Sequence, residues 1–133
     1  MKKSYQNPYL LSRDNYQNLI AQAVSNLLEN AVKYSDFRSA IAVRADQANG
    51  VNDLPSLVIS VTSTGLPIKQ EETKKLFERG FRGSTAKQKV PAGTGIGLYL
   101  AKRVMTLHAG AIGIRTNGKQ SQFRLIFPWS SLV

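Results

Sequence analysis

Two asparagines, Asn26 and Asn30, lie one helical turn apart in a segment whose apolar residues recur with the period of an α-helix. On a helix over residues 15–34 the apolar residues form one stripe, and both amides lie with Lys33 along its edge. The stripe consists of Ile20, Ala23, Val24, Leu27, Leu28 and Ala31. A buried helix flank is unfavourable for an amide unless a polar group binds there. The pattern predicts either a ligand-binding edge or two amides bonded to neighbouring backbone, and this helix alone does not separate them.

A glycine-rich segment, Gly93-Thr94-Gly95-Ile96-Gly97-Leu98, leads directly into a second helical pattern that ends near His108. Glycines let backbone N–H groups approach phosphate oxygens, and a helix N-terminus adds the positive end of its dipole. Tight turns before helices use the same residues, so the glycines alone are a weak signal. An asparagine oxygen suits Mg²⁺ and a lysine suits phosphate, so the two segments together favour a nucleotide site.

Length and composition set limits on the kind of protein. With 133 residues, 42% of them hydrophobic, we expect a single domain over residues 1–133, with a flexible leading segment at about 1–8. There is no cysteine, which excludes disulfides and thiolate metal sites. No apolar run suits a signal peptide or a membrane span, so we expect a cytoplasmic domain without membrane contact of its own.

The net charge of +10 is the main argument for another class of function, because basic domains often bind nucleic acid. Basic residues are densest between Lys74 and Lys89. However, no zinc-ligand spacing, helix-turn-helix signature or aromatic pattern of an RNA-binding sheet is present. Nucleotide phosphates, an acidic partner domain or a solvated basic surface explain the cluster as well, so nucleic acid is the lesser alternative.

The order of elements predicts a two-layer α/β (α+β) sandwich, with a mixed sheet covered by helices on one face. After the first helix we expect strands at residues 38–46 and Leu57–Thr62, then a helix at Glu71–Arg79. A mobile loop at about residues 80–95 comes before the helix Leu98–His108. Strands at Ala111–Thr116 and Gln122–Phe127, joined by a turn at Asn117-Gly118, complete the pattern.

Four blocks give the chain its resemblance to a known family. They are Asn26–Tyr34, Val61–Ile68, Leu76–Gly83 and Gly93–Leu98, followed by a final strand at Ser121–Pro128. In order and spacing they resemble the asparagine, first glycine, phenylalanine and second glycine boxes of the catalytic, ATP-binding domain of sensor histidine kinases. This domain belongs to the GHKL superfamily and has the Bergerat-type ATP-binding fold. The resemblance covers nearly the whole chain.

The resemblance implies a role for each matching residue. Asn30 would hold Mg²⁺ on the ATP phosphates, with Asn26 beside it as a catalytic-site residue. Arg82, and with it Arg79, would meet the γ-phosphate, and Phe77 would anchor one end of the ATP lid. The remaining implied nucleotide-site residues are Lys33, Tyr34, Ser63, Gly65, Gly93, Thr94, Gly95, Gly97 and Leu98.

The resemblance also bears on the reaction. GHKL enzymes that hydrolyse ATP carry a glutamate where this chain has Asn26, and an amide cannot take a proton from water. Glu29 lies on another side of the helix. Transfer of phosphate from Mg-ATP to a histidine is therefore favoured. The acceptor would be on a separate dimerisation and phosphoacceptor domain, with a response regulator as a further partner. The single histidine, His108, is expected to pack or cap, and the chain alone to be monomeric.

Ser63 departs from the family pattern, which has an aspartate there to accept a hydrogen bond from adenine; Pro67 replaces a glycine. Loss of a charge-assisted bond costs about 1.5–3 kcal/mol, roughly ten- to a hundredfold in affinity. Three hypotheses follow: a weak or partner-assisted ATP-dependent kinase, which we favour, a pseudokinase that contacts other proteins, and a basic binding module that reuses the fold.

Overall fold

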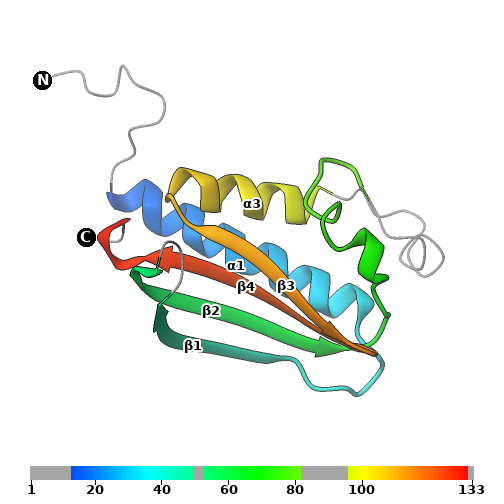
Figure 1. Cartoon of the computed structure of the whole chain (residues 1–133). Helices are drawn as coiled ribbons and strands as arrows, with labels where there is room; N and C mark the ends of the chain where they lie inside the picture. The colour runs from blue at the N-terminus through cyan, green and yellow to red at the C-terminus, as the bar shows by residue number, and fades with distance from the viewer. Residues whose placement is uncertain (1–12, 50–52, 82–95, 132–133) are drawn as a thin grey trace, which may run out of the picture.

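The computed structural model describes residues 13–49, 53–81 and 96–131. Along the chain (Figure 1) these form α1 (Arg13–Tyr34), β1 (Ala42–Asn49), β2 (Pro55–Thr64), the 3-10 turn η3 (Gln70–Glu72), α3 (Gly97–Leu107), β3 (Ala111–Asn117), β4 (Gln120–Pro128) and the 3-10 turn η4 (Trp129–Ser131). The leading segment 1–8 and most of the expected lid, residues 82–95, lie outside the described residues.

The four strands form one sheet in the order β1-β2-β4-β3, and each neighbouring pair is antiparallel. The predicted sandwich is confirmed, but among the described strands the sheet is antiparallel rather than mixed. Gly118, with φ of 61°, lies in the predicted turn between β3 and β4. A positive φ costs glycine little, which explains the tight connection.

Helices α1 and α3 lie side by side and cover one face of the sheet (Figure 1). The predicted stripe of α1 is confirmed, because Ala23, Leu27 and Ala31 are buried at four-residue spacing. From the sheet, every second residue of β4 enters the same core: Phe123, Leu125 and Phe127. Burial of a side chain of this size contributes about 1.5–3 kcal/mol. On the other face of the sheet, Ser56, Val58 and Ser60 of β2 are also buried, but they lie outside this cluster.

The predicted helix at Glu71–Arg79 is wrong beyond its first residues, because the structure has only η3 there, followed by turns. Successive backbone bonds reach back three residues, from Glu72 to Lys69, from Lys75 to Glu72 and from Glu78 to Lys75. The Thr73 hydroxyl also donates to the Gln70 carbonyl at 2.9 Å, in competition with helical pairing. This tighter winding lets the adjacent residues Leu76 and Phe77 both enter the core.

The strands differ from prediction mainly at their ends. β1 begins at Ala42 rather than residue 38, because Ser39 holds the preceding chain in a turn. Its hydroxyl donates to the carbonyls of Asp36, at 2.6 Å, and Thr64, at 3.3 Å. β2 extends two residues beyond both predicted ends. None of the described helices has both the length and the apolar character needed to cross a bilayer.

Candidate functional site

A pocket opens on the helix side of the sheet, where the end of α1 meets the end of β2 and the start of β4. Its polar lining comes from Asn30, Tyr34, Ser63, Glu72 and Ser121. Its apolar lining comes from Leu66, Ile68, Leu76, Leu98 and Phe123, with Gly65 at the end of β2. An apolar cleft with a few convergent polar groups is the usual form of a small-molecule site. The pocket thus joins residues from all four sequence blocks and the final strand.

Two serines face one another in the wall of this pocket. Ser63 on β2 is the register partner of Ser121 on β4, and the Ser121 side chain is buried. Their hydroxyls can each donate and accept a hydrogen bond. Ser121 was missed by the sequence analysis, because its place beside Ser63 depends on the register of two strands that are far apart in the sequence. The sequence did contain a signal for Ser121: the alternation along this strand places Ser121 on the same face as Phe123, which lies in the core.

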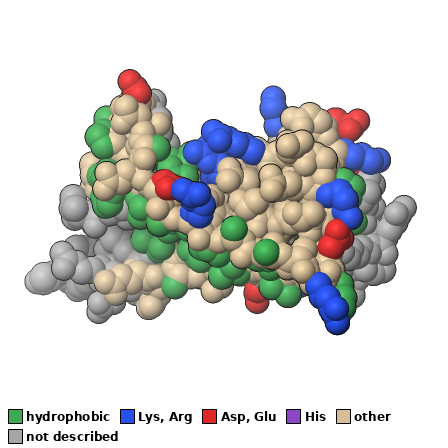
Figure 2. Space-filling model, turned by 90° about the horizontal axis from the view of Figure 1, so that it is seen from below, with side chains coloured by type: hydrophobic (Ala, Val, Ile, Leu, Met, Phe, Trp, Pro, Cys, Tyr) green, Lys and Arg blue, Asp and Glu red, His purple; other side chains and the backbone are tan. Residues whose placement is uncertain are grey.

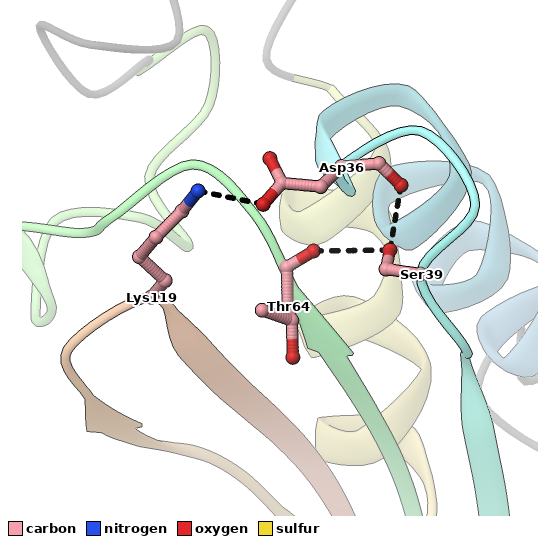
Figure 3. Close-up of polar contacts among 4 residues, drawn as sticks. All are labelled: Asp36, Ser39, Thr64 and Lys119. Carbon is pink, nitrogen blue, oxygen red and sulfur yellow. Dashed lines mark hydrogen bonds and ion pairs between the residues drawn. The ribbon is translucent and has the colours of Figure 1, made fainter.

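The end of α1 is fixed to the end of β2 by backbone hydrogen bonds. The N–H of Asp36 donates to the carbonyl of Thr64 at 2.9 Å, and that of Leu66 donates to Tyr34 at 3.0 Å. The N–H of Gly65 donates to the Lys119 carbonyl in the β3–β4 turn at 2.8 Å. Figure 3 shows that the Lys119 ammonium reaches Asp36 as well, at 2.6 Å. Three distant segments thereby hold the pocket residues in place.

Gly65 is required by this junction. A Cβ at this position would lie 2.2 Å from the Tyr34 carbonyl oxygen and 2.6 Å from the Ser35 Cα. Both are backbone atoms, so a side chain cannot fit unless one chain moves away from the other. Gly65 lines the pocket, and its small size also permits the close approach of α1 and β2.

The two asparagines of α1 lie differently. Asn30 lines the pocket, half-buried, whereas Asn26 lies one turn earlier, next to the start of α3 at Gly97. The Asn26 Nδ2 is buried and has no hydrogen-bond partner among the described residues. A buried amide left without a partner costs about 1–3 kcal/mol, so it marks a place where an acceptor is expected. The amide oxygen of Asn30 has the chemistry of a Mg²⁺ ligand, so this residue fits a magnesium ion.

The structure does not bring every predicted residue to the pocket. Lys33 is exposed on α1 and does not line it. The Arg79 guanidinium lies 5.7 Å from the Tyr99 ring centroid and lines a separate hollow with Lys102 and Arg103. Gly97 is the first residue of α3, followed by Leu98 in the pocket wall. The other predicted residues, Arg82, Gly93, Thr94 and Gly95, lie outside the described residues.

Three further residues considered in the sequence, Phe77, Glu29 and His108, do not line the pocket. Phe77 packs edge-to-face on Phe123, with ring centroids 6.2 Å apart, and so ties the segment after η3 to the sheet. Glu29 is exposed and does not line the pocket. His108 is 3% exposed, and its Nδ1–H donates to the Val104 carbonyl at 2.9 Å. The expectation that His108 packs is therefore confirmed.

Comparison with known proteins shows which family the chain belongs to. The model of the family described as histidine kinase-, DNA gyrase B-, and HSP90-like ATPase matches residues 15–131. The chain belongs to this family. Among solved structures, the mycobacterial sensor histidine kinase MprB is similar, with a TM-score of 0.73 at 28% identity over 84% of this chain and 72% of that one. The likeness to histidine kinase domains predicted from the four blocks is thus confirmed.

Curated relatives of this ATPase-family domain are much longer proteins. The sensor-like histidine kinase SenX3 of Mycobacterium tuberculosis (strain ATCC 25618 / H37Rv) is 34% identical over 113 residues, 84% of this chain and 26% of SenX3. The sensor histidine kinase CusS of Escherichia coli O157:H7 is 30% identical over 110 residues, 83% of this chain and 22% of CusS. The chain therefore spans about a quarter of the length of these relatives.

Proposed function

We propose that this domain binds Mg-ATP in the pocket of Ser63 and Asn30 and donates the γ-phosphoryl group to a histidine. The acceptor is on a separate dimerisation and phosphoacceptor domain, in two-component signalling on the cytoplasmic side. The observation that carries the proposal is the convergence of Asn30, Tyr34, Ser63 and Leu98 on one pocket. A histidine kinase of which this is the catalytic part then passes the phosphate to a response regulator.

The pocket has the chemistry of an adenine site with phosphates toward α1. Its apolar walls, among them Ile68, Leu76 and Leu98, suit the faces of a flat base. The paired hydroxyls of Ser63 and Ser121 suit the polar edge of the base, since they can accept from its amino group. Asn30 would supply one oxygen to Mg²⁺, and the ion, when bound, neutralises phosphate charge.

Transfer is favoured over hydrolysis because of Asn26. Its amide lies in the helix that carries Asn30 but cannot accept a proton from water, and Glu29 faces solvent instead. The residues of the site can therefore position the nucleotide and stabilise charge, while the incoming nucleophile comes from another domain.

Calorimetric titration with a non-hydrolysable ATP analogue, with and without magnesium, tests the proposal. We expect binding that magnesium strengthens, and we expect Asn30→Ala to abolish the magnesium-dependent part, because a ligand oxygen is lost. Asn18→Ala, an exposed asparagine on the same helix, is the matched control and should bind like the parent. Unchanged magnesium-dependent affinity in Asn30→Ala would contradict the role of Asn30.

One observation favours a second candidate, a pseudokinase that acts through protein contacts. Ser63 provides a hydroxyl where the family uses a carboxylate, and a hydroxyl is the weaker acceptor. Absence of analogue binding at millimolar concentration, with or without magnesium, would select the pseudokinase.

A further inference from the structure

The sheet face opposite the helices carries a row of arginines. Arg44 on β1, Ser60 on β2 and Arg124 on β4 are successive register partners, and Arg115 on β3 is opposite Gln122, two residues from Arg124. We call these five residues the arginine face; they line a shallow hollow together with Asp46, Ala48 and Val58. Figure 2, seen from below relative to Figure 1, shows Lys and Arg side chains in blue, with hydrophobic side chains in green between them.

This face lies on the other side of the sheet from the pocket. Along β4, Ser121 and Phe123 point toward the helices, so Gln122 and Arg124 point away from them. The sheet separates the two surfaces, so a ligand of the arginine face does not compete with a nucleotide in the pocket.

The charges on the arginine face are incompletely balanced. Arg44 has an acidic neighbour, since its guanidinium lies 3.3 Å from the Asp46 carboxylate. Within the described part of the chain, neither Arg115 nor Arg124 forms a salt bridge. Burial lowers the pKa of the Arg124 guanidinium, and the nearby charge of Arg115 lowers it further. Arg115 and the half-buried Arg124 are two neighbouring positive charges, and this arrangement favours binding of an anion between them.

We propose that the arginine face docks an acidic, carboxylate-rich segment of a partner protein. Guanidinium groups bind carboxylates through paired N–H···O bonds, and Arg115 and Arg124 are close enough to share one acidic segment. The half-buried Gln122 amide, which donates to the Thr62 hydroxyl at 3.2 Å, adds a neutral polar group, whereas Ser60 is buried in the floor of the hollow.

Charge and composition favour protein over nucleic acid as the occupant. Asp46 borders the hollow and would repel a continuous phosphate backbone. The described lining contains no aromatic side chain on which a base could stack. Three arginines match a short acidic segment better than a long polyanion.

The test uses a fluorescein-labelled hexaglutamate peptide and the whole chain, with fluorescence anisotropy at low ionic strength. We expect Arg115→Gln/Arg124→Gln to bind the peptide at least about tenfold more weakly, because charge-assisted bonds are lost. Lys74→Gln/Lys75→Gln removes the same charge from exposed sites elsewhere and should change affinity less than about twofold. Arg44→Gln changes a side chain that is 70% exposed. Its effect on peptide affinity can therefore be measured even if the double variant does not fold.

Three outcomes would overturn the proposal: no peptide binding by the parent, equal loss in the arginine and lysine variants, or tighter binding of short duplex DNA than of the peptide. Titration of the ATP analogue should be the same for the parent and the arginine double variant. That result separates failure at this face from failure of the nucleotide site.

Discussion

Ser63 presents a hydroxyl to the pocket wall, opposite the buried Ser121. A hydroxyl makes a weaker hydrogen bond to an amino group than a carboxylate does, since the carboxylate bond is charge-assisted. If the edge of adenine meets these two serines, the acceptor strength at Ser63 limits affinity for ATP.

We therefore expect Ser63→Asp to bind the ATP analogue roughly tenfold more tightly than the parent, by calorimetry with magnesium present. Ser130→Asp, at an exposed serine beyond the end of β4, adds the same charge away from the pocket and should leave affinity unchanged. Unchanged or weaker binding in Ser63→Asp would mean that the base is held by other groups.

Asn26 and Asn30 illustrate what could be predicted for single residues. Helical periodicity placed both on one edge, because that property depends on local geometry alone. Which of them lines the pocket depends on where α3 and β2 meet α1, and local sequence does not contain this information. The pairing of Ser121 with Ser63 was beyond prediction for the same reason.

At the scale of elements, the α1–β2 junction depends on the absence of a side chain at Gly65. Gly65→Ala should destabilise the domain by about 1–3 kcal/mol, as overpacking does, because the new Cβ would meet the backbone of Tyr34 and Ser35. The free energy of unfolding in urea measures this change.

Gly113→Ala on β3 is the matched control, because a Cβ there would meet nothing within 4 Å. It should be neutral or slightly stabilising, by up to about 1 kcal/mol, through a less flexible unfolded chain. Equal stability of the two variants would contradict the tight approach at Gly65.

Elements with a strong apolar period were predicted well, and the segment after η3 was not. α1, α3 and β4 each bury one periodic face, which the sequence reveals directly, whereas every residue of β1 is exposed. Residues that favour a helix surround Leu76 and Phe77. The side chains of Leu76 and Phe77, however, are both buried in the core. Tertiary packing there prevails over helix propensity, which is worth only tenths of a kcal/mol per residue.

For the whole molecule, the net charge of +10 should make stability depend on salt. The two salt bridges among the described residues are both largely exposed, so they offset little of the repulsion between positive charges. Raising the ionic strength to about 0.15 M shortens the screening length to about 8 Å. We expect the thermal midpoint to rise, and to rise less in Arg115→Gln/Arg124→Gln; a midpoint that falls with salt would contradict this.

The strand order also has a consequence for how the chain acquires its structure during synthesis. Of the four described strands β4 is synthesised last, yet it occupies the interior of the sheet between β2 and β3. Until it emerges, β3 lacks its neighbour and one edge of β2 remains open to association with other chains. Pairings this distant in sequence form slowly, since a long loop must close first. We therefore expect Ser121 to reach its place beside Ser63 only after β4 has been synthesised, so that the pocket wall is completed at that stage.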